Sequence, residues 1–600
     1  MTGAVNMPEN LSDRFFETLT SLRHSIAKDP RRNPTEYLAY QISTEIENNK
    51  VDVDQLGKLA KDLSDQAFMR RAEHIKNYIG LSSEADLQAR LDQLISRSLI
   101  DNGSAVSFEQ FAKHWEQTSS GAVFTAHPTF GMNRTMRKVM ADMASCTDVE
   151  TRERIEEDLS ALPHVADESI TLEDEHEDVQ STIERIQHAL RWFNKQVLRR
   201  AREVWPDQWS TLNPAPLSVA SWVGYDLDGR TDIGWQQMIR LRLEEKTTQL
   251  ERYLDQAQAL QTQGSDLDCS ALGKLVHTLD AALVSAQSHL SKFEGDVEQP
   301  EILADAANAL TAEQQSGNIT SSRPIIEIID QAITDIAKRD DDLVENLVLL
   351  RSEIKTIGLG TAHLHFRINA TQLHNGFTHI RELDGETVTS SRMQMSRLNE
   401  LIERAEAHKV SFRSLMHEGT TALRQFILIA QILKHIDQDS PIRFLIAECE
   451  SPFTVLVALY FARLFGVEHK VDISPLFETP SAMEKGVRIL EQLVDNDRYL
   501  AYIKLRGRIA IQTGFSDAGR FIGQITATLA VERLQMKLAR MLGHRGMTGI
   551  EVLFFNTHGE SIGRGAHPTN MSGRLDYVLS PAARCQYVRA GIPLKHETSF

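Results

Sequence analysis

The stretch IRFLIAECESPF, residues 442–453, shows the pattern that decides the fold: a short apolar run, a polar loop with an acid, and the start of a helix. The apolar runs that follow this pattern are residues 442–447, 471–474, 508–513 and 551–555. Ser451 and Thr479 each precede a proline, which is the usual arrangement of a helix N-cap and first turn. Regular alternation of strands and helices predicts parallel βαβ units, in which strands buried on both faces are continuously apolar.

Charged side chains follow these runs at the points where the predicted strands end. Glu478 follows the second run, Asp517 follows the third, and Arg564 lies in the glycine-rich loop after the fourth. In parallel α/β folds the functional side chains lie at the carboxyl ends of the strands. We therefore expect these three residues to contribute to one site.

The composition limits the classes of partner. The 600-residue chain is 41% hydrophobic and carries a net charge of −18, which disfavours nucleic acid or an anionic membrane as a partner. Four widely spaced cysteines fit reduced thiols better than disulfides or a zinc site. The longest apolar stretch, residues 453–467, contains Arg463 and is too short to span a bilayer. We expect a cytoplasmic protein.

Long segments show apolar residues at three- and four-residue spacing, which predicts helices. Among them we expect a helix over residues 53–67 and a single long helix from the end of the third apolar run to about Leu542. We expect a helical N-terminal region over residues 1–115 and an α/β catalytic region over 116–600, with helical insertions at about 145–210 and 236–350. The acidic segment 149–184 is typical of a solvated helix face or loop rather than a metal buffer. Residues 314–323, rich in Gly, Asn and Ser, are predicted to be an exposed connection.

Two further segments carry candidate functional groups. His127 follows a short apolar run and precedes a proline, which favours an extended strand end; a structural role for this histidine is the alternative. In residues 361–367 strict alternation places His363, His365 and Arg367 on one face of a strand. Three such groups on one face call for an anion, a metal or water.

The segment 224–230 places Asp226 and Asp228 before a glycine, as at the start of a calcium-binding loop. The acid that should close such a loop is absent, since Met238 lies near that position. We therefore reject calcium binding here.

Taken together, five segments in this order resemble the signature segments of the phosphoenolpyruvate carboxylase family. They are residues 125–129, 221–229, Arg367 at its strand end, 475–479, and 514–517 followed by 561–565. The resemblance implies a mostly helical protein with α/β character, a (β/α)8-type barrel embedded in many long helices, usually assembled as a tetramer. It implies the formation of oxaloacetate from phosphoenolpyruvate and bicarbonate, through carboxyphosphate and an enolate, with Mg²⁺ or Mn²⁺.

The resemblance also assigns roles to residues of this chain. Those assigned to catalysis are His127, Arg367, Arg564 and His558. Those assigned to substrate binding are Arg367, Arg564, Arg520 and Ser561, and those assigned to the metal are Glu478 and Asp517. Capping of the helices that follow is the alternative role for the two acids. Arginine suits the binding of phosphate and carboxylate because its guanidinium donates two parallel hydrogen bonds.

The chain departs from the family pattern at several positions. The departures are Phe130 in place of Glu, Leu227 in place of Arg, Arg230 in place of Asn, Arg520 in place of Lys, and Asn556 and His558 in place of the His and Arg of the glycine-rich loop. The family pattern also continues for several hundred residues beyond Phe600. The chain is thus expected to be either part of a longer protein or a divergent relative.

Two other functions fit the same residues. A catalytically altered or silent relative would bind a phosphorylated metabolite without turning it over. A metal-dependent hydrolase on an α/β barrel would use His363, His365, His558 and Asp517 as ligands. Carboxylase activity with bicarbonate distinguishes the first from an active enzyme, and bound zinc would favour the second.

Overall fold

A computed structural model describes most of the chain. The described residues are 11–26, 28–29, 33–80, 83–101, 103–125, 132–167, 169–230, 232–294, 299–311, 317–337, 339–383, 391–557 and 570–600. They form two compact units, one made of residues 1–81 and 128–169, the other of 82–127 and 170–600. The expected regions, divided at residue 115, are continuous in sequence. Each of these units is instead built from two separate segments of the chain.

The smaller unit is helical. Its helices are α1 (Leu11–Ile26), α2 (Pro34–Glu47), α3 (Val53–Ile79), α6 (Arg134–Ser145) and α7 (Val149–Ala161). Its core joins α3, α6 and α7 through buried Phe68, Met136, Met140 and Leu159. The helix expected to stop at residue 67 continues to Ile79, since Gly80, with φ of 66°, caps it in the left-handed conformation that glycine adopts without a steric penalty.

The larger unit is a closed barrel of eight parallel strands, in the order β10-β3-β4-β5-β6-β7-β8-β9, which confirms the predicted barrel. The strands are β3 (Ser120–Phe124), β4 (Leu217–Ser221), β5 (His363–Asn369), β6 (Ile442–Ala447), β7 (Val471–Phe477), β8 (Arg508–Gly514), β9 (Glu551–Thr557) and β10 (Leu594–Ser599). A separate two-residue pair, β1 (Ile100–Asp101) and β2 (Ser104–Ala105), is antiparallel.

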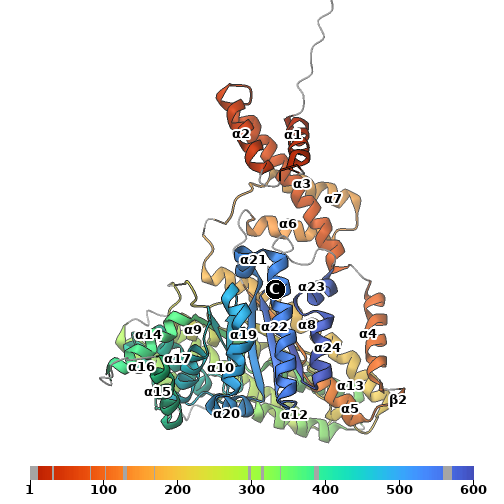
Figure 1. Cartoon of the computed structure of the whole chain (residues 1–600). Coiled ribbons are helices and arrows are strands. Elements are labelled where there is room, and N and C mark those ends of the chain that lie inside the picture. Colours follow the sequence, from red (N-terminus) through yellow and green to blue (C-terminus); the bar gives the residue numbers. More distant parts are fainter. Residues whose placement is uncertain are drawn as a thin grey trace, which may run out of the picture. The chain divides into compact units, whose positions relative to one another are not determined.

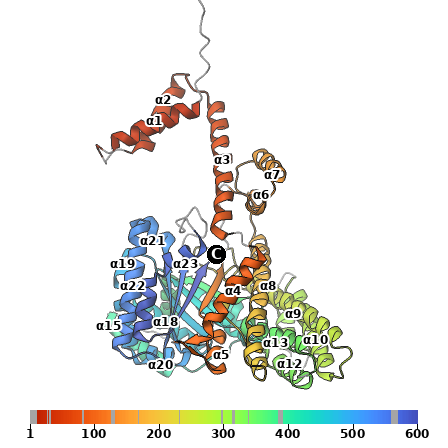
Figure 2. The same ribbon diagram turned by 90° about the vertical axis from the view of Figure 1, so that its right-hand side faces the viewer.

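Helices surround the barrel and fill the insertions (Figures 1 and 2). They are α4 (Glu84–Ser98), α5 (Phe108–Glu116), α8 (Leu172–Val204), α9 (Trp235–Gln263), α10 (Ser270–Phe293), α11 (Pro300–Thr311), α12 (Arg323–Ile336), α13 (Asp341–Ile357), α14 (Ala370–Leu383), α15 (Ser391–Arg404), α16 (Phe412–His417), α17 (Thr421–His435), α18 (Pro452–Leu464), α19 (Pro480–Val494), α20 (Asp497–Arg506), α21 (Phe515–Ile522), α22 (Gln524–His544), α23 (Met571–Val578) and α24 (Pro581–Ala590). One core lies around the barrel, and a second lies among α8, α9, α10, α12 and α13.

Local sequence signals account for the element boundaries near the barrel. Ser451 and Thr479 are the N-caps of α18 and α19, each with proline in the first turn, as predicted. The single long helix expected after β8 is instead two helices, because Gly523 lies between them with φ of 80°. A residue with a side chain adopts that φ only with strain.

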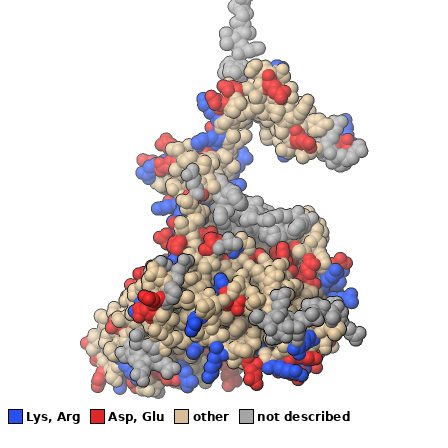
Figure 3. Space-filling view, turned by 90° about the vertical axis from the view of Figure 1, so that its left-hand side faces the viewer, with Lys and Arg blue, Asp and Glu red and all other residues tan. Residues whose placement is uncertain are grey.

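The surface of the larger unit differs from one expectation. In the described part of the predicted exposed connection, residues 317–322 are buried or half-buried, because their backbone and serines bind the adjoining network described below, whereas Arg323 is exposed. On the face shown in Figure 3, acidic and basic side chains are interleaved. Among the described residues, no helix combines the length and apolarity that a membrane span needs.

Candidate active site

The carboxyl-terminal mouth of the barrel brings together Arg367 and Glu478. Arg367 lies near the end of β5, and Glu478 directly follows β7. Both side chains are largely buried, with Arg367 16% exposed and Glu478 5% exposed. The Glu478 carboxylate is close enough to contribute to the raised pKa of Arg367, after the two aspartates described next.

Two aspartates hold the Arg367 guanidinium. Its Nη1 lies 3.2 Å from Asp226 Oδ2, and its Nη2 lies 2.7 Å from Asp228 Oδ2. Burial opposes the charge of Arg367, but these carboxylates outweigh that effect and raise its pKa. Burial raises the pKa of Asp226, and the arginine only partly offsets this. The two acids of the apparent calcium loop therefore form ion pairs with an arginine.

Backbone pairing explains how these groups meet. The segment after β4 runs beside β5, with Leu227 N donating to Arg367 O at 2.8 Å and Arg367 N donating to Tyr225 O at 3.1 Å. Gly224 and Gly229, with φ of 87° and 78°, provide the turns on either side. The guanidinium also lies over the Trp222 ring, 5.3 Å from its centroid. The pairing fixes the guanidinium at the mouth of the barrel.

Backbone contacts position the Glu478 carboxylate. Its Oε1 accepts a hydrogen bond from Glu448 N at 3.0 Å. Glu448 follows β6 with φ of 56°, an uncommon left-handed conformation for a residue with a side chain. A Cβ on Gly514, at the end of β8, would lie 3.3 Å from Glu478 Oε2. Glycine at this position therefore leaves the room that the carboxylate uses.

The other predicted site residues are described incompletely. Asp517 and Arg520 lie in α21, directly after β8, with only their backbones described. His127, His558, Ser561 and Arg564 lie outside the described residues, as does Phe130. Their assigned roles remain predictions.

The described departures from the family pattern place no free charge at this mouth. Leu227 is buried in the barrel core. Arg230 binds Asp232 and Glu175, with distances of 2.7 and 2.8 Å. Asn556 is fully buried, bonded to Thr513 and, at 2.9 Å, to His596.

The three polar groups that alternate along β5 do not converge. Alternate residues of a strand lie about 6.6 Å apart, so they occupy successive levels of the barrel. His363 Nε2 lies 2.8 Å from Thr356 O, and His365 Nε2 lies 3.8 Å from Glu597 Oε2. Burial lowers the pKa of His363 to about 4 and that of His365 to about 3. The hydrolase alternative is therefore not favoured, and no group of three or more candidate metal ligands occurs among the described residues.

Comparisons with known proteins identify the family of the chain. The model of the phosphoenolpyruvate carboxylase family matches residues 9–572. The chain belongs to the phosphoenolpyruvate carboxylase family. Enzymes of that name from Tolumonas auensis and Hahella chejuensis are 23% and 21% identical to it, and each alignment covers 94% of this chain. Phosphoenolpyruvate carboxylase 1 of Zea mays is 21% identical over 94% of this chain. The chain spans 65%, 64% and 63% of these three relatives.

Proposed function

We propose that this protein is a phosphoenolpyruvate carboxylase that forms oxaloacetate from phosphoenolpyruvate and bicarbonate. The observation that carries the proposal is a fixed guanidinium, Arg367, beside a buried carboxylate, Glu478, at the carboxyl-terminal mouth of a closed parallel barrel. The family match over residues 9–572 supports the same reaction. Functional residues of such barrels lie at this end.

The reaction proceeds in three steps. A bicarbonate oxygen attacks phosphorus, and the bond from phosphorus to the enol oxygen breaks, which gives carboxyphosphate and the enolate of pyruvate. Carboxyphosphate then loses its carboxyl proton and splits into carbon dioxide and phosphate. Finally the enolate carbon attacks carbon dioxide, which forms the new C–C bond of oxaloacetate. Because negative charge crowds together in the first step, cationic donors are the main requirement.

Arg367 meets that requirement through its position. Nη1 and Nη2 each carry a second hydrogen beyond the one directed at an aspartate, and Nε has no hydrogen-bond partner in the described part of the chain. These hydrogens are available for the oxygens of a phosphoryl or carboxylate group. Asp226 and Asp228 act as positioning residues, since they fix the guanidinium and keep it protonated.

Oxygen donors on consecutive strands fit a hard divalent ion. Glu478 follows β7 and Asp517 follows β8, and Mg²⁺ or Mn²⁺ is usually held by one or two carboxylates together with water and substrate oxygens. These two residues would hold the ion. When bound, it would offset negative charge on the phosphoryl oxygens.

We assign the remaining steps to residues whose side chains the structure does not describe. His127 accepts the proton that carboxyphosphate loses, so that carbon dioxide forms beside the enolate. Arg564, His558, Arg520 and Ser561 bind the substrate's charged groups. The site must exclude water while the enolate is present, because water would protonate the enolate to pyruvate. A cytoplasmic homotetramer that supplies the tricarboxylic acid cycle completes this proposal.

A catalytically silent relative is the second candidate function, and it differs from the first in having no turnover. Asp226 and Asp228 both pair with Arg367, and buried Leu227 stands where the family resemblance implies an arginine. A site with fewer positive groups binds a trianionic substrate more weakly. Such a protein would bind a phosphorylated metabolite without forming oxaloacetate.

A coupled assay distinguishes the two candidates. The full chain is supplied with phosphoenolpyruvate, bicarbonate and Mg²⁺, and oxaloacetate is reduced by malate dehydrogenase while NADH absorbance is followed. The carboxylase proposal predicts bicarbonate-dependent NADH loss that falls at least about a hundredfold in Glu478→Gln, which keeps the side-chain size. Binding of phosphoenolpyruvate without oxaloacetate would favour the silent relative.

A further inference from the structure

The opposite, amino-terminal mouth of the barrel contains a separate cavity. Its volume is about 550 Å³, which is within the range of small-molecule sites. The first residues of several strands line it, together with the end of α13 and the loop before β6. The charged or titratable side chains in its lining are Lys355, Arg443, Arg508, Lys595, His363, Glu116, Asp439 and Glu551.

Arg443 is the buried cation of this cavity. It is 6% exposed, its Nη2 lies 3.1 Å from Glu597 Oε1, and its Nη1 lies 3.9 Å from Asp472 Oδ2. Neither Nε nor Nη1 of Arg443 has a hydrogen-bond partner in the described part of the chain. Both nitrogens are enclosed by the surrounding atoms. A buried donor without an acceptor is costly, so a small rotation of the guanidinium toward an acceptor in the adjoining cavity would be favourable.

The buried acids behind Arg443 already have cationic partners. Lys595 Nζ lies 3.1 Å from Glu597 Oε1, and Arg506 Nε lies 2.7 Å from Asp472 Oδ1. Burial opposes the charge of Glu597, but Arg443 and Lys595 outweigh it and lower its pKa, so Glu597 stays ionised. The acids therefore account for Nη2 of Arg443 and leave its other two nitrogens without a hydrogen-bond acceptor.

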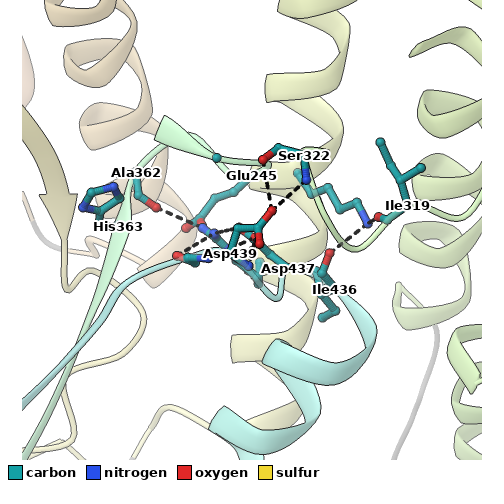
Figure 4. A network of polar contacts seen from close by, with 12 residues as sticks. Glu245, Ile319, Ser322, Ala362, His363, Ile436, Asp437 and Asp439 are labelled. Atoms are coloured by element: carbon teal, nitrogen blue, oxygen red, sulfur yellow. Dashed lines mark hydrogen bonds and ion pairs between the residues drawn. The ribbon is translucent and has the colours of Figure 1, made fainter. Parts of the chain in front are cut away.

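A network of polar contacts holds one wall of the cavity in place (Figure 4). Asp439 Oδ2 accepts hydrogen bonds from Ser322 N at 2.7 Å and from Ser322 Oγ at 3.0 Å, and both residues line the cavity. Beside them, fully buried Arg242 lies 2.6 Å from Asp437 Oδ2 and 2.7 Å from Glu245 Oε2. Such a network, with its charges paired, fixes the loops that carry the lining residues.

Stability of the barrel is the ordinary role of this end of the fold. A structural ion network explains Glu597 and Asp472, because each buried acid is paired. It does not explain why the buried guanidinium of Arg443 leaves two nitrogens without an acceptor beside an open cavity. Ordered water is the simplest occupant consistent with a purely structural role.

We propose that this cavity binds a small oxyanion, a carboxylate or a phosphate, with Arg443 and Lys595 as the buried donors and Lys355 at the rim. Glu116, Asp439 and Glu551 in the lining make a highly charged polyanion a poor fit. The site is independent of the catalytic mouth, because its lining residues come from the amino-terminal ends of the strands.

Binding of three probes to the full chain tests this proposal. Inorganic phosphate and malonate are titrated calorimetrically, and a selenate-soaked crystal reports the position of the oxyanion through selenium anomalous scattering. We expect a selenium peak beside Arg443 and saturable binding of at least one of the other two probes. Binding of phosphate but not malonate would assign a phosphate site, and the reverse would assign a carboxylate site.

Matched variants connect the binding to the cavity. Arg443→Lys keeps the positive charge beside Glu597 but removes the paired N–H donors of the planar guanidinium. The dissociation constant of the bound probe should therefore rise at least about tenfold. Lys355→Gln at the exposed rim should raise it about two- to fivefold, and Lys274→Gln, on the exposed face of α10, should leave it unchanged. Ordered water alone at Arg443, a selenium peak only at the catalytic mouth, or equal affinity in all variants would overturn the proposal. The test measures binding only, so its outcome does not depend on carboxylase activity.

Discussion

Replacing His365 with glutamine should change how stability depends on pH. His365 is 2% exposed inside the barrel, 3.8 Å from Glu597 and packed against Phe555 with ring centroids 5.3 Å apart. Burial lowers its pKa to about 3; Glu597 acts in the opposite direction, and Arg443 and the other nearby cations reinforce the lowering. The folded protein therefore holds this ring neutral down to low pH.

The magnitude follows from the difference between the folded and unfolded states. In the unfolded chain, His365 is protonated with a pKa of about 6.5. Between pH 6.5 and about 3 the unfolded chain therefore carries a proton on this ring and the folded protein does not. The contribution of neutral His365 to the free energy of unfolding is therefore fully present above pH 6.5 and decreases as the solution is acidified. Between pH 7 and pH 5 this one residue costs about 2 kcal/mol of unfolding free energy.

Urea titrations followed by tryptophan fluorescence at pH 7 and pH 5 measure this cost. From pH 7 to pH 5, the wild type should lose about 2 kcal/mol more unfolding free energy than His365→Gln. His277→Gln, at an exposed position on α10, should follow the wild type and serves as the control. Equal pH dependence in the wild type and His365→Gln would refute the argument that burial keeps His365 neutral.

Three further substitutions test the catalytic mouth. Gly514→Ala places a Cβ 3.1 Å from the Cβ of Glu478, so the affinity for Mg²⁺, measured by calorimetry, should fall about two- to tenfold. Gly549→Ala is the control and should leave this affinity unchanged, because the space around its Cβ is open. His127→Asn should still consume phosphoenolpyruvate but release pyruvate, detected with lactate dehydrogenase; loss of substrate binding would instead indicate a positioning role. His558→Arg should tighten phosphoenolpyruvate binding roughly ten- to a hundredfold, and wild-type affinity should rise toward about pH 6; insensitivity to both would place this loop away from the phosphate.

Local signals in the sequence predicted much of the barrel. The strand at residues 442–447 and the helix starts at Ser451 and Thr479 were placed correctly, since apolar runs and caps act within a few residues. The break at Gly523 was missed because a lone glycine within a helical pattern is also tolerated there. Such a signal does not distinguish a kink from a continuous helix.

Contacts between distant segments could not be predicted in the same way. Asp226 and Asp228 resembled part of a calcium loop, yet they bind Arg367, which lies about 140 residues away along the chain. A single sequence gives no measure of that proximity. One usable signal was overlooked: Arg443 and Asp472 are charges inside otherwise apolar strands, and such charges require buried partners. These two charges indicate a buried polar cluster inside the barrel, although not the cavity beside it.

Isotopically labelled bicarbonate tests the central claim most directly. In the proposed reaction a bicarbonate oxygen attacks phosphorus, so the phosphate released from unlabelled phosphoenolpyruvate should carry one bicarbonate oxygen. With ¹³C,¹⁸O-bicarbonate, mass spectrometry should find ¹³C in oxaloacetate, trapped as malate, and one ¹⁸O in each phosphate. Phosphate without ¹⁸O, or no labelled malate above the level in Glu478→Gln, would contradict the assignment of carboxylase activity to this barrel.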